Sequence, residues 1–449
     1  MKRVRIGNGC GFWGDNLDAP IALAEHGQLD YLTLEYLAEL TMSILAIQKQ
    51  RDPGSGYAGD FLDVLKRLGT TLVAKPAMRI VTNAGGMNPL ACARRAREIL
   101  DATGNANRKI GIVSGDDLMP RLDELLQAGH QLCNLDTGEP LHPVRDRVVS
   151  VNAYLGSRPI VEALVRNASI VITGRVADAC LTVGPAIFEH GWKLDDINRV
   201  AAATVAGHLI ECGAQVTGGL SCRWETVPNL ADVGYPIADI AADGTFRIEK
   251  PPGTGGIINR ETIAEQLLYE VGDPRRYLTP DVIADFTTVS VRQVARDVAE
   301  VAGSRGNPAS DSYKVSIAYR DGFTSSGMLA IPGPDAARKA RFAGNMLLQR
   351  LERIGICFAH SHVETIGAGE LVPGLTPAYD PPEVMMRVAV RDTSKQAVER
   401  FTKEFAPLVT SGPPGVTGYT TGRPAVREVF AYWPALIDKS AVHETVEIL

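Results

Sequence analysis

The sequence predicts an α/β protein, with an N-terminal domain built on a mostly parallel sheet with helices on its faces and a smaller α+β domain after it. Three observations support this fold class. Up to about residue 220, short β-rich segments alternate with helical patterns, which is typical of βα units. Gly, Asn, Asp, Thr and Ser accumulate just after several predicted strands. Past residue 287 the order of elements becomes βαββαβ-like, which indicates a separate unit.

The length of the chain also favours two domains. Its 449 residues exceed the usual size of one compact domain. We place residues 1–286 in the α/β domain and residues 287–449 in the α+β domain. The composition, 45% hydrophobic and 22% charged, is ordinary for a globular protein, so each domain can bury a core.

The N-terminal domain is expected to contain six strands, each a short apolar or β-branched segment. They are placed at Val4–Gly7, Tyr31–Leu34, Thr71–Ala74, Lys109–Val113, Val148–Ala153 and Ser169–Thr173. Helices at Leu90–Leu100 and Pro120–Ala128 have apolar residues at helical spacing. Because the carboxyl ends of parallel strands share one edge, the polar loops after them should gather there and bind a ligand. The pattern fits an open sheet or a barrel equally well.

A Pro- and Gly-rich region covers Ser221–Pro280 and contains a predicted helix at Arg260–Tyr269. The elements of the C-terminal domain follow it. They are an extended pair at Tyr313–Tyr319 and Gly327–Ile331, a helix at Asp335–Ile354, strands at Cys357–Thr365 and Val384–Arg391, a helix at Lys395–Val409 and a strand at Val426–Tyr432.

Charge, hydropathy and cysteine usage exclude several classes of protein. The net charge of −6 comes without a basic stripe, so we expect no nucleic-acid partner. Apolar stretches are too short to span a membrane, and no secretory signal precedes the first strand, so we expect a cytoplasmic protein. The seven cysteines are scattered without a CxxC pair, which suggests neither a disulfide framework nor a zinc ribbon.

The first glycine-rich loop offers the GxGxxG spacing through Gly9, Gly11 and Gly14, between a strand and a helix. Glu35 stands where a dinucleotide site would need its ribose-binding acid. Asp15 at the helix start would repel a pyrophosphate, so no NAD is expected. The loop is either a ligand-contacting loop, with Gly9 and Gly11 close to the substrate, or a tight turn capped by Asp15.

Four acids lie on or just after the first two strands: Asp15, Asp30, Glu35 and Glu39. Carboxylates at this edge could hold a divalent metal or act as a general base, and Asp15 and Glu35 are the catalytic candidates among them. The alternative for each is a helix cap or a structural ion pair.

Two further loops carry candidate substrate-binding residues. In the second glycine-rich loop, Asn83, Gly85, Gly86 and Asn88 could form an anion-binding nest before a helix, or a sharp strand-to-helix turn. The loop Gly174–Asp178 contains Arg175, which could bind a carboxylate or phosphate, with Gly174 beside it and Asp178 as a catalytic acid. A structural Arg175–Asp178 ion pair is the alternative.

Two histidine motifs could also carry chemistry. His208 and Glu211 are three residues apart on a predicted helix, so they share a face and could form an acid–base pair, although such a histidine is more often packed in a core. The segment His360–Glu364 puts two histidines and a glutamate on one face of a strand, as a metal site or as a solvent-facing polar stripe. A loop at Gly412–Arg423, with Thr420 and Thr421, could close over a ligand or mediate a contact between subunits.

Several motifs together resemble the acyclic terpene utilisation (AtuA) family over most of the chain. They are Gly9-x-Gly11-Phe12-x-Gly14-Asp15, Asp30-Tyr31-Leu32-x3-Tyr36-Leu37-Ala38-Glu39-x-Thr41-Met42, Asn83-Ala84-Gly85-Gly86-Met87-Asn88-Pro89, Ile172-Thr173-Gly174-Arg175-Val176-Ala177-Asp178, Gly207-His208-x2-Glu211-Cys212-x2-Gln215-x2-Gly218-Gly219, and Gly255-Gly256 with Tyr269-Glu270-x2-Asp273-Pro274. Gly255 and Gly256 join the substrate-binding candidates on this resemblance.

The resemblance implies a catabolic role, because members are associated with the breakdown of acyclic terpenes, whose intermediates are branched acyl-CoA thioesters. Some relatives carry a small extra C-terminal domain, which leaves open a small partner subunit for this chain, beside a homo-oligomeric state.

We therefore expect an enzyme acting on a branched acyl-CoA or carboxylic acid by acid–base chemistry of the lyase or hydratase type. The second hypothesis is a binding or scaffold subunit that becomes active only with a small partner protein.

Overall fold

The computed structural model describes residues 2–375, 379, 381–419 and 422–449. Thr420 and Thr421 of the predicted loop lie outside these residues. The chain divides into unit 1, made of Met1–Ala318 with Tyr432–Leu449, and unit 2, Tyr319–Ala431. Residues 287–318 and 432–449 thus group with the first unit. The chain enters unit 2 within strand β14 (Ser312–Pro332) and returns within β18 (Arg427–Asp438).

Unit 1 is built on a ten-stranded sheet with the order β11-β12-β8-β7-β1-β2-β3-β6-β4-β19. Its five central strands are parallel: β1 (Arg3–Asn8), β2 (Tyr31–Leu34), β3 (Arg79–Thr82), β6 (Ile170–Thr173) and β4 (Ile110–Ser114). The flanking strands are antiparallel: β7 (Ile237–Ala241), β8 (Phe246–Glu249), β12 (Val298–Ala302), β11 (Ser290–Ala295) and β19 (Thr445–Ile448).

The prediction of a mostly parallel sheet is therefore wrong, because the sheet is mixed. The connections from β7 to β8 and from β11 to β12 are only a few residues long. Connections this short join antiparallel neighbours, whereas parallel strands need a long crossover. The antiparallel strands come from the Pro- and Gly-rich part of the chain and from residues beyond 287, where no βα alternation is visible.

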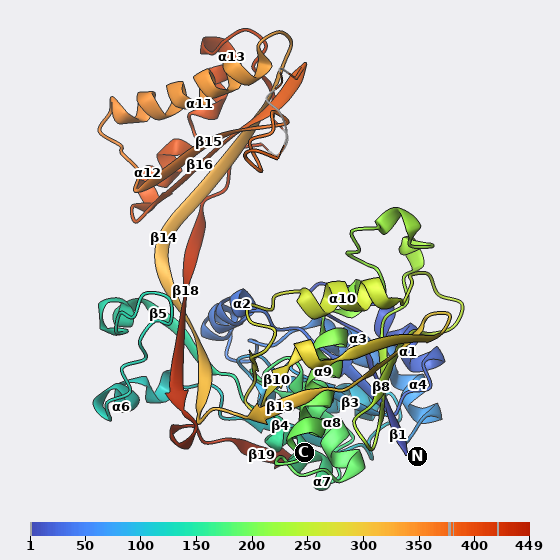
Figure 1. Ribbon diagram of the computed structural model, residues 1–449. Helices are drawn as coiled ribbons and strands as arrows, with labels where there is room; N and C mark the ends of the chain where they lie inside the picture. The colour runs from blue at the N-terminus through green and yellow to red at the C-terminus, as the bar shows by residue number, and fades with distance from the viewer. Residues whose placement is uncertain (1, 376–378, 380, 420–421) are drawn as a thin grey trace. The chain divides into compact units, whose positions relative to one another are not determined.

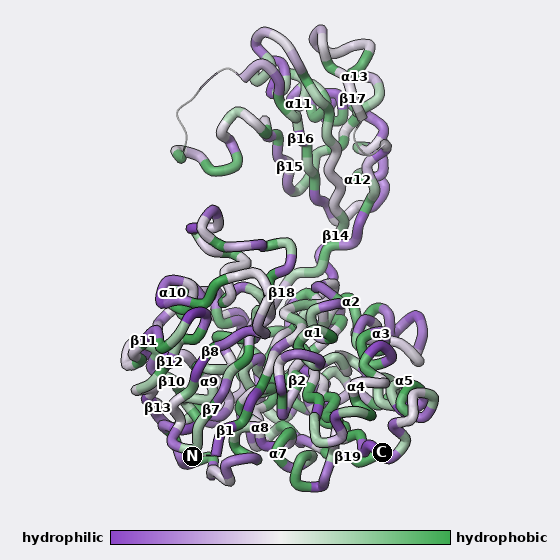
Figure 2. The backbone as a smooth tube through the Cα atoms, turned by 90° about the vertical axis from the view of Figure 1, so that its right-hand side faces the viewer, coloured by the Kyte–Doolittle hydropathy of each residue, from purple (hydrophilic) through white to green (hydrophobic). Residues whose placement is uncertain are grey.

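Helices cover both faces of the sheet in unit 1 (Figure 1). One face packs against α1 (Ala19–His26), α2 (Glu39–Arg51), α3 (Asp60–Arg67), α4 (Gly69–Ala74) and α5 (Pro89–Ala102), whose apolar residues form one continuous core with the strands. The other face packs against α7 (Arg158–Val165), α8 (Cys180–His190) and α9 (Ile197–Glu211). In Figure 2 the hydrophobic colour runs through these strands and helices.

Helix α9 is buried on all sides, from Val200 to Ile210. It lies between the large sheet and a second, three-stranded sheet, which explains why its sequence is apolar all round rather than on one stripe. The second sheet consists of β13 (Arg305–Pro308), β10 (Val282–Asp285) and β9 (Tyr277–Leu278). The short helices α6 (Leu122–Gln127) and α10 (Arg260–Leu268) complete unit 1, together with β5 (Val148–Ala153), which pairs with β14.

Unit 2 contains an antiparallel sheet whose one face is covered by helices. The strands follow the order β15 (His360–Ile366), β16 (Glu383–Asp392), β14 and β17 (Thr417–Tyr419), and β18 also pairs with β14. The helices are α11 (Ala336–Glu352), α12 (Lys395–Phe401) and α13 (Phe405–Ser411). Within the described residues of both units, no helix is both long enough and apolar enough to cross a membrane.

Candidate functional site

A cleft of about 530 Å³ opens in unit 1 at the edge where the parallel strands end. Residues after β1, after β2, after β6 and after α9 and α10 line it. Its carboxylates are Asp15, Glu35, Glu39, Asp178, Glu211 and Glu270. The predicted convergence of Asp15, Glu35 and the loop after β6 at one edge is thus present in the structure.

Glu35 is almost completely buried at the end of β2, with 5% of its side chain exposed. Its Oε1 atom accepts hydrogen bonds from the backbone N–H of Leu37 at 3.0 Å and from the amide of Asn83. Its Oε2 atom is buried without a hydrogen-bond partner. Burial and the nearby Asp178 carboxylate raise the pKa of Glu35 well above its usual range, against the opposing effect of Arg175. The burial of Glu35 therefore favours its protonated form over its ionised form.

Arg175 lies beneath the cleft, with 1% of its side chain exposed. Its Nη1 atom donates to the carbonyl of Leu37 at 2.6 Å, and its Nη2 atom is 2.8 Å from the carboxylate of Asp178. The guanidinium also lies over the ring of Tyr154, 4.0 Å from its centroid. The arginine is thus held by groups of the protein itself, as in the structural ion pair considered from the sequence.

Asp178 and Glu39 are the acids on either side of this arginine. Burial raises the pKa of Asp178, and Arg175 opposes that rise. Burial would also raise the pKa of Glu39, but Lys314 and other donors outweigh it and lower that pKa below its usual value. The Oε1 atom of Glu39 accepts from the hydroxyl of Tyr154 at 3.0 Å and lies 3.3 Å from Nζ of Lys314. Glu39 is therefore an ionised, paired carboxylate.

Asp15 organises the loop after β1. Its Oδ2 atom accepts from the backbone N–H of Gly11 at 2.8 Å, and its Oδ1 atom accepts from the hydroxyl of Tyr235 at 2.6 Å. A Cβ atom at Gly11 would lie 2.8 Å from the carbonyl carbon of Cys212, so only glycine allows this loop to pack on the end of α9. Asp15 thus shapes one wall of the cleft.

Glu211 forms a pair with the buried His208 at the end of α9. Nδ1 of His208 is 2.9 Å from Oε1 of Glu211, and Oε2 of Glu211 is buried without a hydrogen-bond partner. Burial raises the pKa of Glu211 to about 7, although His208 opposes the rise. Burial lowers the pKa of His208, but Glu211 outweighs this, so the net shift is upward. This carboxyl group can therefore exchange a proton near neutral pH.

The other glycine-rich segments predicted to bind substrate are buried and do not line the cleft. Gly9 donates its N–H to the carbonyl of Thr33, and Asn83 holds Glu35 as described. Asn88 caps α5 by accepting from the N–H of Ala91. The remaining candidates of this kind are Gly85, Gly86, Gly174, Gly255 and Gly256, all buried. Their roles as direct ligands of a substrate stay predictions.

Asp116 packs against Gly174 and binds the backbone of Arg175. The Oδ2 atom of Asp116 accepts from the backbone N–H of Arg175 and from the amide of Asn152, each at 2.9 Å. Burial raises the pKa of Asp116 to about 7. A Cβ atom at Gly174 would lie 2.2 Å from Asp116 Oδ1, so this contact requires glycine.

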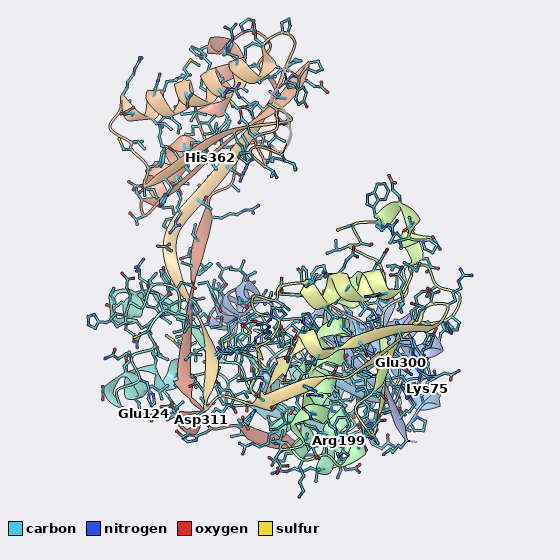
Figure 3. The ribbon with its side chains drawn as sticks, viewed as in Figure 1. Lys75, Glu124, Arg199, Glu300, Asp311 and His362 are labelled. Carbon is cyan, nitrogen blue, oxygen red and sulfur yellow. The ribbon has the colours of Figure 1, made fainter. Side chains whose placement is uncertain are left out.

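Other sequence candidates lie away from the cleft. Asp30 precedes β2 and accepts from the N–H of Arg5, so it is at the opposite edge of the sheet. In unit 2, His362 (Figure 3) is exposed on β15, and Glu364 is paired with Arg387. Among the described residues, no three His, Cys, Asp or Glu side chains gather as metal ligands.

Sequence reasoning missed three residues that support the cleft: Tyr154, Tyr235 and Lys314. Tyr154 follows β5, Tyr235 precedes β7, and Lys314 lies on β14. None of them stands in a motif with the acids that it contacts. Tyr269 and Glu270 were part of the quoted resemblance but received no role, although both line the cleft.

Comparison with known proteins identifies the family to which the chain belongs. The model of the acyclic terpene utilisation family protein AtuA matches residues 4–448, nearly the whole chain. No curated protein and no solved structure matches the chain. Because the family model spans both units and all of the cleft residues, the chain belongs to the acyclic terpene utilisation (AtuA) family.

Proposed function

We propose that the chain is a catabolic enzyme of acyclic terpene utilisation that performs acid–base chemistry of the lyase or hydratase type on a branched acyl group. One observation carries this proposal. Glu35 and Glu211 line the same cleft, and each has one carboxyl oxygen held by the protein and the other buried without a partner. Buried unsatisfied oxygens are costly, and a reacting ligand would give them a partner.

The two carboxyl groups differ in their affinity for protons, which suits them to opposite roles. Glu35 is the proton donor, because its pKa lies well above the usual range. Glu211 is the base, because its pKa of about 7 leaves a large ionised fraction at neutral pH. Pairs of titratable groups held at different pKa values are typical of acid–base active sites.

In the hydratase direction, Glu211 takes a proton from water as the hydroxyl oxygen bonds to the β-carbon of an enoyl group. The C=C π bond breaks, and its electron pair takes the proton of Glu35 at the α-carbon. Glu211 ends protonated and Glu35 ionised, and exchange with solvent restores both. Elimination is the reverse sequence. Phe12, Leu37 and Leu220 line the same cleft and provide apolar surface for a branched hydrocarbon chain.

The test uses the purified full chain with the N-acetylcysteamine thioester of 3-methylbut-2-enoic acid in D₂O. Deuterium incorporation at the α-carbon, followed by NMR, reports proton transfer in either direction. Glu35→Gln and Glu211→Gln should each slow incorporation by about 100-fold or more. Glu124→Gln is the matched control, because Glu124 lies on α6, does not line the cleft and is exposed (Figure 3).

Incorporation that is equally fast in wild type and in both active-site variants would contradict the assignment of Glu35 and Glu211. A purified chain that is inert alone, and that gains activity when a small partner protein is added, would favour the scaffold hypothesis instead.

A further inference from the structure

We infer that the cleft accepts an uncharged carbonyl head group and excludes the free carboxylate, and that Glu270 is the residue that sets this choice. The inference deepens the proposed function, on which it rests for the identity of the cleft as the substrate site. It follows from which charged side chains line the cleft and which of them are already paired with other groups of the protein.

No lysine or arginine is among the residues that line the cleft in the described part of the chain. The nearest cation, Arg175, is fully buried beneath it. Its two terminal nitrogens are engaged by Asp178 and by the carbonyl of Leu37, and the face of its guanidinium is covered by Tyr154. A substrate carboxylate would have to displace these contacts to reach the guanidinium, so Arg175 does not serve as its anchor.

Lys314 is the second cation near the cleft, and it is also engaged. Its Nζ atom is 3.3 Å from Glu39 and 4.8 Å from the centroid of the Tyr154 ring. The lysine charge thus balances a carboxylate of the cleft wall and leaves no net positive charge for a ligand. Arg175 and Lys314 are therefore both already paired within the protein.

The negative charges of the cleft are not balanced in the same way. Asp15 has both oxygens occupied by neutral donors, namely backbone N–H groups and the hydroxyl of Tyr235, and not by a cation. Glu270 is exposed and forms no ion pair among the described residues. These two carboxylates repel an anion that enters the cleft, whereas they do not penalise a neutral thioester, ester or amide.

The backbone at Glu270 supports its assignment. Glu270 follows the end of α10 with φ at +57°, in the left-handed region that non-glycine residues rarely occupy. A residue is kept in this conformation when its surroundings determine it, and such residues cluster at ligand-binding sites. Glu270 and the neighbouring Tyr269 both line the cleft.

Glu35 provides the hydrogen bond that favours an uncharged carbonyl head group. Glu35 lines the cleft, and its Oε2 atom is buried without a hydrogen-bond partner. In its protonated form it donates one hydrogen bond, which a carbonyl oxygen accepts. A carboxylate would bring a second, charged oxygen into a cleft whose lining includes Glu211 and Glu270 and, in the described part of the chain, no lysine or arginine.

The experiment compares two ligands of the same shape by titration calorimetry at pH 8 and low ionic strength: 3,7-dimethyloctanoic acid, which is ionised there, and its primary amide. The amide should bind the full chain at least tenfold more tightly than the acid. Equal or tighter binding of the acid would overturn the inference. Binding of neither ligand would overturn it as well.

Variants then test the role of Glu270 in this selection. Glu270→Gln should improve binding of the acid about threefold to tenfold at low salt, with less effect at high salt, because a screened charge is removed. Glu124→Gln, which removes an exposed charge of unit 1 outside the cleft, should leave the ratio of the two affinities unchanged. An unchanged ratio in Glu270→Gln would refute the role of Glu270.

The experiments distinguish a failure of the charge selection from a failure of the proposed acid–base function. If the amide binds more tightly but the thioester shows no deuterium incorporation, the charge selection stands and the acid–base function falls. If incorporation occurs and depends on Glu35 and Glu211 while the acid binds as well as the amide, the function stands and the charge selection falls.

Discussion

His208 and Glu211 share a hydrogen bond of 2.9 Å, and the other ring nitrogen of the histidine is fixed as a donor by a backbone carbonyl. Nε2 of His208 is 2.9 Å from the backbone carbonyl of Gln266, which can only accept. Nε2 therefore carries a proton, and Nδ1 faces Oε1 of Glu211 at 2.9 Å. The proton between them belongs either to an imidazolium facing a carboxylate or to a carboxylic acid facing a neutral imidazole. The rings of Tyr277 and Phe286 pack on the histidine and keep water from it.

The pH dependence of activity should report this pair. If Glu211 is the base, kcat/KM rises with pH through about 7, as the carboxyl group loses its proton. In His208→Gln the positive charge that opposes the burial effect is gone, so the rising limb should move to higher pH by about one unit or more. A pH–rate profile of both proteins is the measurement. A purely structural role of His208 would lower kcat without moving the limb.

Removal of Arg175 should destabilise unit 1 strongly. Arg175→Met leaves the buried Glu35 and the partly exposed Asp178 without their cation, and the expected loss in the free energy of unfolding is about 3–5 kcal/mol. Urea unfolding at neutral pH measures it, and the loss should shrink at pH 5 as the acids take up protons. Arg95→Met removes an exposed pair with Glu98 and should cost less than about 0.5 kcal/mol. Equal costs in the two variants would contradict the account.

Asp116 should make the protein less stable as the pH rises. An acid with a higher pKa in the folded state binds more protons when folded, so the free energy of unfolding falls between the unfolded and the folded pKa. For Asp116 this window runs from about 4 to about 7. Asp116→Asn keeps an acceptor for the N–H of Arg175 and buries no charge. Thermal unfolding should show the variant close to wild type at pH 4.5 and more stable at pH 8; a variant less stable at pH 8 would refute the sign.

Gly174→Ala should disturb the contact between the loop after β6 and Asp116. The added Cβ atom would meet Asp116 Oδ1 at 2.2 Å, and relief requires a shift of one loop. We expect a loss of about 1–3 kcal/mol in the free energy of unfolding, together with weaker binding of ligands in the cleft. Gly272→Ala is the matched control, because nothing lies within 4 Å of its added Cβ atom. Denaturant unfolding and calorimetry of both variants check the expectation.

Local sequence patterns were sufficient to predict segments that are buried or that are capped by adjacent residues. The strands Tyr31–Leu34 and Val148–Ala153 have the predicted bounds. The predicted strand Thr71–Ala74 is wrong, since these residues form α4, where Leu72 packs into the core beside α3. The β-branched residues there favour a strand locally, and packing overrides that preference. Strand β3, Arg79–Thr82, follows this helix and was not predicted.

The elements that could not be predicted from the sequence depend on contacts between segments far apart in the chain. The extended pair Tyr313–Tyr319 and Gly327–Ile331 is one continuous strand, β14. The predicted helix Lys395–Val409 is divided into α12 and α13. In the cleft, the acids after β2 and β6 could be predicted because loops after parallel strands share an edge. Tyr154 and Lys314 could not, because their contacts depend on β5 pairing with β14.

Unit 2 interrupts unit 1 in the chain, and β19 pairs with β4 only after that interruption. During synthesis on the ribosome, the outer side of β4 therefore keeps its N–H and C=O groups unpaired until residues 445–448 emerge. An open strand edge is a template for pairing with other chains. A nascent or truncated chain that lacks Thr445–Ile448 carries this aggregation hazard, and the pairing of β19 with β4 removes it.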